Sequence, residues 1–440
     1  MASDIVVSVD IGTTKIVCLV AQETEQGKIN ILGIGQADTP ENGVLRGAIA
    51  NVPKTAEAIR KAVDIAQKQA NITIQKVFVG IAGQHIQAEQ RQTTKARTNP
   101  EKDISQQDID ILMEEVSRLA KKPEEEVLHI IPQEYMIDVD MDIKDPIGMC
   151  GTKITGNYLV VSGSSTSIRN LERCVEVAGL ENVGTVLEPI ASAHCALTKE
   201  EKEAGMLLID MGGGTTNLAV YYDGILRDVF VVPFGGEIIT NDIKKHFKII
   251  NTQAELIKTS FGSALEPRKE EDIILPGINE ESPEKHVSKK ELSQVIQARL
   301  EEIVDMIFTR LVANGNDRLI VGVSLTGGGS LLQLVGTFIH QRYELNVRMV
   351  KASQYAFLEE KSKEKVDSPI YSTALGLALE AIRHSKKNPA LFQVIPEIEP
   401  EPEIKVNPEP EPKNIEETPK APKKNIVKNL FGSIINFLDN

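Results

Sequence analysis

One motif occurs twice in this chain, first as Val6-Val7-Ser8-Val9-Asp10-Ile11-Gly12-Thr13-Thr14-Lys15 and about two hundred residues later as Leu207-Leu208-Ile209-Asp210-Met211-Gly212-Gly213-Gly214-Thr215-Thr216-Asn217. Each copy is an apolar run that ends in Asp-x-Gly, continues with small hydroxyl residues and leads into a second apolar run. The pattern predicts a β-hairpin whose tight turn presents backbone N–H groups and hydroxyls beside a carboxylate. Glycine lets the main chain approach an anion closely, and successive N–H groups form a nest that binds phosphate.

The acid of each copy adds a metal to this prediction. A carboxylate beside a polyphosphate is repulsive unless a divalent cation lies between the two, so Asp10 and Asp210 imply Mg²⁺. Two such hairpins that face each other would clamp one nucleotide between two similar domains.

Composition limits the class of protein. The 440 residues are 41% hydrophobic and 25% charged, which predicts two to four domains of roughly 100–200 residues each. The net charge of −14 argues against a chain that binds nucleic acid as a whole. The four cysteines are widely scattered with no C-x-x-C pair, so we expect buried thiols rather than disulfides or zinc. We expect neither a signal peptide nor a transmembrane helix, and therefore a cytoplasmic protein.

Each hairpin begins a longer pattern that is also repeated. The first half predicts strands at 5–9, 16–21 and 29–35, a helix after Pro53 and a strand at 77–81. The second half predicts strands at 206–209, 217–222 and 226–232 and a helix at 237–247. This order indicates two homologous lobes.

Two insertions interrupt the lobes. Residues 84–160 predict a small α+β subdomain, with a helix at 106–120 that Ser105 and Asp108 cap and strands at 127–131 and 135–139. Residues 241–311 are more charged and predict a helix from Lys289 to Leu311.

The last fifty residues change character twice. Residues 389–424 are rich in proline and glutamate and predict a disordered tether. Residues 425–440 predict an amphipathic helix, which could dock on the globular body, on a partner protein or in the plane of a membrane. The long tether favours the membrane, to which the nearby lysines would contribute about 1 kcal/mol each. The residues expected at the lipid are Ile426, Val427, Lys428, Leu430, Phe431, Ile434, Ile435, Phe437 and Leu438.

Three further motifs fit a nucleotide clamp. Ser324-Leu325-Thr326-Gly327-Gly328-Gly329-Ser330-Leu331 predicts a strand that enters a glycine turn suited to a nucleoside. Glu188-Pro189-Ile190-Ala191-Ser192-Ala193-His194-Cys195 and Ser368-Pro369-Ile370-Tyr371-Ser372-Thr373-Ala374-Leu375-Gly376-Leu377 predict helices whose small side chains allow a close crossing, as a hinge between lobes requires.

Together these motifs resemble the actin/Hsp70/sugar-kinase superfamily. The resemblance implies an α/β, two-lobed actin-like (ribonuclease H-like) fold that binds ATP with Mg²⁺, which Asp10 and Asp210 would approach through water. It implies that one side of the phosphates contacts Gly12, Thr13, Thr14 and Lys15, and the other Gly212, Gly213, Gly214, Thr215, Thr216 and Asn217. Adenosine would lie beside Gly327, Gly328 and Gly329, with Glu255 and Lys258 of an E-x-x-K helix at the ribose and base.

Two of these residues have plainer alternatives. Relatives place a residue that orients the attacking water where Glu188 stands, but an acid at a helix start is also favoured by the helix dipole alone. Lys15 could be merely a solvated charge in a turn.

The inserted segment narrows the resemblance. His129-Ile130-Ile131-Pro132-Gln133-Glu134-Tyr135, Asp138 and Asp145-Pro146-Ile147-Gly148-Met149-Cys150-Gly151 resemble the subdomain that replaces actin's small subdomain in the FtsA family of bacterial division proteins. The resemblance implies at most slow ATP hydrolysis, self-association into filaments, and peripheral attachment to anionic lipids on the cytoplasmic side of the membrane at the division site. It also implies binding of the C-terminal peptide of FtsZ through residues 241–311 and recruitment of later division proteins.

The domain boundaries follow from these assignments. Lobe 1 takes residues 1–83, 161–200 and 365–388 around the insertion at 84–160, and lobe 2 takes 201–240 and 312–364 around the insertion at 241–311. A small-molecule kinase of the same fold and an actin-like adaptor of pilus assembly are the rival functions.

Overall fold

The computed structural model describes residues 5–269, 271–277 and 283–388 and the backbone of 395–396, all within one compact unit that spans Met1–Glu397. The membrane-helix prediction at 425–440 and nearly all of the predicted tether lie outside the described residues. Among the described helices, none combines the length and apolar character needed to cross a bilayer.

The first sheet has the strand order β12-β7-β1-β2-β3. Its strands are β1 (Ile5–Ile11), β2 (Lys15–Glu23), β3 (Ile29–Asp38), β7 (Lys76–Ile81) and β12 (Glu181–Leu187). β1 and β2 form the predicted antiparallel hairpin, and β7 lies parallel to β1. Val7 and Val9 pack toward α1 (Val52–Ala70) and α3 (Ser165–Val177), while Val6 and Leu19 pack toward α4 (Glu188–Ala196) and α11 (Ser372–Lys387). Both faces are thus covered, which explains the continuous apolar runs.

The second sheet repeats the first, with the order β15-β14-β13-β18-β19. Its strands are β13 (Met206–Met211), β14 (Thr216–Tyr222), β15 (Ile225–Val232), β18 (Gly322–Thr326) and β19 (Asn346–Met349). β13 and β14 are antiparallel, and β18 is parallel to β13. One face packs on α6 (Gly236–Phe247), α7 (Asn251–Phe261), α8 (Lys289–Ala313) and α9 (Val335–Tyr343). The predicted two-lobed α/β fold class is confirmed by this shared topology.

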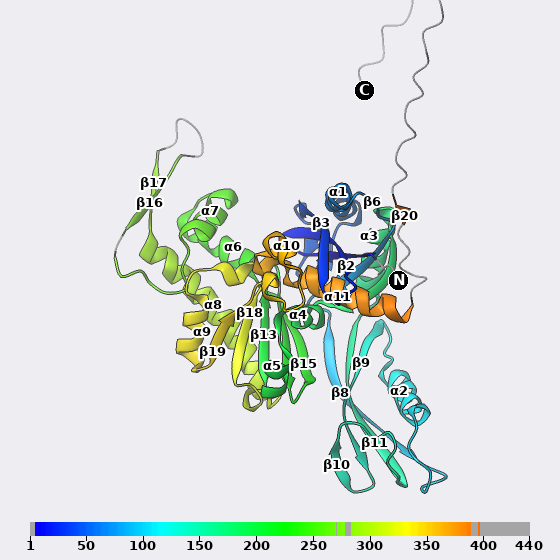
Figure 1. Cartoon of the computed structure of the whole chain (residues 1–440). Coiled ribbons are helices and arrows are strands. Elements are labelled where there is room, and N and C mark those ends of the chain that lie inside the picture. The colour runs from blue at the N-terminus through cyan, green and yellow to red at the C-terminus, as the bar shows by residue number, and fades with distance from the viewer. Residues whose placement is uncertain (1–4, 270, 278–282, 389–394, 397–440) are drawn as a thin grey trace, which may run out of the picture. The chain divides into compact units, whose positions relative to one another are not determined.

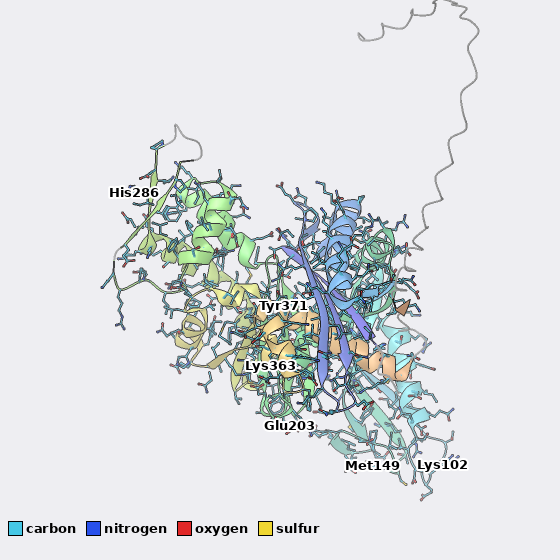
Figure 2. All side chains as sticks on the ribbon, turned by 45° about the horizontal axis from the view of Figure 1, so that its top comes forward. Lys102, Met149, Glu203, His286, Lys363 and Tyr371 are labelled. Atoms are coloured by element: carbon cyan, nitrogen blue, oxygen red, sulfur yellow. The ribbon has the colours of Figure 1, made fainter. Side chains whose placement is uncertain are left out.

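The inserted subdomain is a sheet in the order β10-β9-β11-β8 with one helix, α2 (Gln106–Ala120), against it (Figure 1). Its strands are β8 (Gln87–Ala96), β9 (Glu125–Ile137), β10 (Asp140–Ile143) and β11 (Lys153–Ser164). The predicted helix and its cap are confirmed, because the Ser105 N–H donates to Asp108 Oδ2 at 3.0 Å. Figure 2 shows Lys102 and Met149 close together at the outer end of the subdomain.

Two predictions for this subdomain are wrong, one about its strands and one about the burial of its cysteine. The strands expected at 127–131 and 135–139 form one strand, β9, because an irregularity in the β9–β11 pairing accommodates Pro132 opposite Tyr158. The strand ends at Ile137, and Val139 lies in the following turn with 85% of its surface exposed. Cys150 is exposed in the loop before β11, whereas the other three cysteines are buried free thiols as predicted.

The remaining elements are short. They are β4 (Val44–Leu45), β5 (Ala48–Ile49), β6 (Ile72–Thr73), α5 (Lys199–Ala204), β16 (Asp272–Leu275), β17 (Lys285–Ser288), α10 (Glu360–Lys363) and β20 (Ile395–Pro396).

A buried histidine joins the inserted subdomain to lobe 1. His129 Nε2, on β9, accepts a hydrogen bond from the Leu187 N–H at 3.1 Å, just before α4. Burial lowers the pKa of His129 to about 4, against a smaller opposing effect of Glu380. The ring is therefore neutral at pH 7 and accepts through its unprotonated nitrogen.

This histidine should make the fold sensitive to acid. The unfolded state takes up a proton near pH 6.5 and the folded state only near pH 4, so stability is lost as the pH falls through that window. Between pH 7 and pH 5 the wild type should lose about 2 kcal/mol of its free energy of unfolding through His129. We expect His129→Gln, whose amide oxygen still accepts from Leu187, not to lose this amount. Urea unfolding of both proteins at the two pH values measures this difference. An equal pH dependence in the two proteins would contradict the assignment.

Candidate functional site

The two hairpin turns have the same backbone geometry. The Gly12 N–H donates to the Lys15 carbonyl at 3.0 Å, and the Gly212 N–H donates to the Thr215 carbonyl at 2.9 Å. The residues opposite the acids differ, because Asp10 pairs in register with Val17 and Asp210 pairs with Asn217.

The turns approach each other across the space between the lobes. A Cβ atom built on Gly213 would lie 2.2 Å from Thr14 Cγ2, and one on Gly214 would lie 2.5 Å from Thr13 Oγ1. Any side chain at either glycine would therefore collide with the opposite turn. The repeated motif thus produces two facing glycine turns, as predicted.

The acids at the two turns influence each other. Burial raises the pKa of Asp10 to about 7, the negative charge of Asp210 adds to this, and Lys15 opposes it. Burial also raises the pKa of Asp210, although Asp210 Oδ2 accepts from Ser192 Oγ at 2.7 Å and from Thr373 Oγ1 at 2.9 Å.

This donor set fits a hydrated magnesium ion. A divalent cation between the two carboxylates would relieve their repulsion. Within the described part of the chain, no group of three or more His, Cys, Asp or Glu side chains could hold a metal ion alone. Such an ion would therefore depend on phosphate oxygens and water, which is the usual coordination of Mg²⁺ at nucleotides.

Glu188 is half-buried beside the second hairpin, at the start of α4. It is the first residue of α4, and its Oε2 accepts from Asn217 Nδ2 at 3.1 Å. Burial, with the charges of Asp10 and Asp210, raises the pKa of Glu188 well above its usual value. Asn217 Oδ1 is buried without a partner among the described residues. This polar atom beside Glu188 is suited to a water or ligand hydrogen bond.

A cavity of about 280 Å³ opens next to the turns. Residues predicted from separate motifs line it together, namely Thr14, Gly212, Gly213, Glu255, Lys258, Gly328 and Gly329. Gly327 does not line it but lies against Asp210, where a Cβ atom would be 2.4 Å from Asp210 Oδ1. The volume is close to the lower end of small-molecule pockets.

The E-x-x-K pair is held by α6. Lys258 Nζ donates to Glu255 Oε2 at 2.8 Å, to Thr240 Oγ1 at 2.7 Å and to the Gly236 carbonyl at 3.0 Å. Gly236 in turn donates its N–H to the Gly212 carbonyl at 2.9 Å. The cavity wall and the second turn are thus one hydrogen-bonded unit. Thr240 was not predicted, and its only signal in the sequence is its position about one helical turn after Gly236.

The two helices of small residues cross closely, as predicted. A Cβ atom on Gly376 of α11 would lie 1.9 Å from the Ala191 carbonyl oxygen of α4. α11 begins only at Ser372, after a 3₁₀ turn at Pro369–Tyr371, so the predicted single helix from Ser368 is wrong at its start. Proline at 369 keeps the preceding residue extended.

Three of the residues expected at the phosphates have defined surroundings within the protein. Thr216 Oγ1 donates to the Phe234 carbonyl at 2.8 Å, so this hydroxyl supports the loop before α6. Thr215 is buried in the turn, and Lys15 has a pKa lowered by burial despite the attraction of both aspartates. Lys15 is half-buried rather than fully solvated.

Comparisons with known proteins agree with this geometry. The family model "Cell division protein FtsA" matches residues 207–376, and the model "SHS2 domain inserted in FTSA" matches residues 83–162. The chain is 35% identical to cell division protein FtsA of Neisseria meningitidis serogroup B over 372 residues, which are 84% of this chain and 88% of that protein. It is 31% identical to FtsA of Bacillus subtilis over 388 residues, 87% of this chain and 85% of that one.

A solved structure shares the fold at lower identity. The chain is similar to a chain of a "PilM-PilN type IV pilus biogenesis complex", with a TM-score of 0.64 and 16% identity over 86% of this chain and 98% of that one.

Proposed function

Because the chain belongs to the FtsA family of cell division proteins, we propose that it binds ATP with Mg²⁺ and tethers FtsZ polymers to the cytoplasmic face of the membrane at the division site. It does so through its C-terminal segment, self-associates into filaments and recruits later division proteins. The observation that carries the proposal is the facing pair of glycine turns, preceded by Asp10 and Asp210, beside the 280 Å³ cavity.

The chain's own groups have distinct tasks at the nucleotide. The glycine turns would present main-chain N–H groups to phosphate oxygens, and Asp10 and Asp210 would hold a hydrated magnesium ion, whose charge would neutralise that of the phosphates. Glu188 orients the attacking water, with Asn217 fixing one of its oxygens. Bound nucleotide stabilises the closed arrangement of the lobes, from which filaments form. Hydrolysis is at most slow, as the family resemblance implies.

The groove between α6 and α8 supports a site for the FtsZ peptide. It has a volume of about 460 Å³ and lies within residues 241–311. Val295 and Ala298 give it an apolar part, and Arg299 Nε donates to Asp242 Oδ2 at 2.5 Å at its edge. A carboxylate of the incoming peptide would compete with Asp242 for the guanidinium, and arginine is enriched among residues that dominate peptide affinity.

Reversing this charge should weaken the peptide. We expect Arg299→Glu to bind a synthetic FtsZ C-terminal peptide about tenfold or more weakly, measured by fluorescence anisotropy. Arg342→Glu is the matched control, because Arg342 also pairs with an acid of α8, Asp305 at 2.7 Å, but does not line the groove. An equal loss in both variants, or none in Arg299→Glu, would count against this site.

The complete proposal is tested by sedimentation with anionic vesicles. FtsZ should sediment with lipid only when this protein and Mg-ATP are both present, and FtsZ that stays in solution would refute tethering.

The rival functions have less support. The likeness to a pilus complex is one of fold, and the inserted subdomain and curated relatives are those of division proteins.

A further inference from the structure

A very small cavity, called the chamber below, lies beside Glu188. Its volume is about 10 Å³, and Gly47, Gly80, His85, Ser167 and Glu188 are among the residues that line it. This is close to the smallest volume that holds one water molecule. A buried water also needs two or more polar partners, so the side chains in the wall decide whether it is retained.

His85 supplies such partners. Both ring nitrogens, Nδ1 and Nε2, are buried without a hydrogen-bond partner among the residues that the structure describes. Burial lowers the pKa of His85, so the ring is neutral at pH 7 and carries one donor and one acceptor. Buried polar atoms without any partner are rare in folded proteins, and an ordered water is the usual explanation.

Glycines bring this histidine and Glu188 to one chamber. A Cβ atom on Gly80 would lie 2.8 Å from Glu188 Cγ, and one on Gly83 would lie 2.9 Å from His85 Nδ1. Gly47, in the β4–β5 turn with φ of +78°, is packed so that its Cβ would be 2.7 Å from the Gly83 Cα. The three glycines thus leave only backbone at these parts of the wall, where a side chain would fill the chamber.

We propose that the chamber holds one water that bridges His85 and the Glu188 carboxylate, and that His85 is thereby a positioning residue for ATP hydrolysis. Asn217 fixes one side of the carboxylate, and the bridged water fixes the other. The carboxylate is then held in the orientation in which it accepts a hydrogen bond from the attacking water. This inference rests on the proposed function, because Glu188 has this task only if the chain hydrolyses ATP.

The test separates hydrolysis from nucleotide binding in the full chain. In His85→Leu, an apolar side chain of similar size cannot hold the water, so we expect single-turnover hydrolysis of Mg-ATP to slow roughly tenfold while the Kd for ATP stays within about twofold. His85→Gln, which can still hydrogen-bond the water, should recover most of the rate. Thr55→Val is the matched control, because Thr55 Oγ1 is also buried without a partner in the described structure but does not line the chamber.

Several results would overturn the inference. They are an unchanged rate in His85→Leu, an equal loss of rate in Thr55→Val, or no recovery in His85→Gln. A wild-type chain that binds ATP without hydrolysing it would overturn this inference and leave the proposed nucleotide site intact, whereas a chain that does not bind ATP would overturn both. A high-resolution crystal structure of the wild type gives an independent reading that does not depend on variant folding: a water bonded to His85 supports the inference, and a dry chamber overturns it.

Discussion

Asp210→Asn is expected to bind Mg-ATP about 10- to 100-fold more weakly than the wild type, the range typical of lost groups around a metal. The asparagine oxygen still accepts from Ser192 and Thr373, so the side chain keeps its place and loses only its charge. Without that charge, a hydrated magnesium ion would have one carboxylate fewer to hold it. Isothermal titration calorimetry in Mg²⁺ measures the loss, and in EDTA the variant should bind ATP at least as tightly as the wild type, because it lacks a charge that repels the phosphates.

Asp228→Asn is the matched control for this substitution. Asp228 is another buried aspartate of the second sheet, 5% exposed against 6% for Asp210, and burial raises its pKa as well. It accepts from Asn314 and Asn316, and it does not line the cavity. Its replacement should leave ATP affinity unchanged. Equal affinity of Asp210→Asn and wild type for ATP in Mg²⁺ would refute the proposal that Asp210 helps to hold magnesium at the nucleotide.

Removal of residues 426–440 is expected to release the protein from anionic vesicles, with a loss of roughly 100-fold or more in lipid affinity. The segment carries eight large apolar side chains and Lys428, and burial of each large apolar side chain is worth about 1.5–3 kcal/mol before the cost of ordering the helix. A 100-fold loss needs only about 2.8 kcal/mol of that sum.

An internal deletion controls for the length of the tail. Removal of residues 397–411 shortens the Pro/Glu stretch and keeps the apolar end, so lipid binding should persist. Co-sedimentation measures both deletions, and a fluorescent fusion of each should show a midcell ring only when the apolar end is present. If the protein without 426–440 sediments with lipid as the wild type does, the anchor lies elsewhere.

The hairpins and the glycine turn could be predicted because each is a local pattern, whereas the E-x-x-K pair was implied only by the family resemblance. An apolar run, a glycine and a hydroxyl determine a turn within ten residues, so no distant contact is needed to recognise it. Their meeting around one cavity could be anticipated only from the family resemblance, since distances between lobes are not local properties.

Other features depend on distant partners and were missed. Ser192 and Thr373 looked like small packing residues, yet their hydroxyls hold Asp210, and only the tertiary structure brings them to it. β8 is so polar that a strand was not expected, and Thr93 is the one residue of it that is buried. Pairing with the long strand β11 along its whole length is what forms it.

The register of the two hairpins gives the clamp a direction. Two copies of one motif related by a pseudo-twofold axis would offer a ligand two equivalent orientations. Asn217 stands opposite Asp210 where Val17 stands opposite Asp10, and only the asparagine reaches Glu188. This divergence between the duplicated halves makes the two sides of the proposed site unequal, so that the reactive end of a triphosphate would meet Glu188 in one orientation alone.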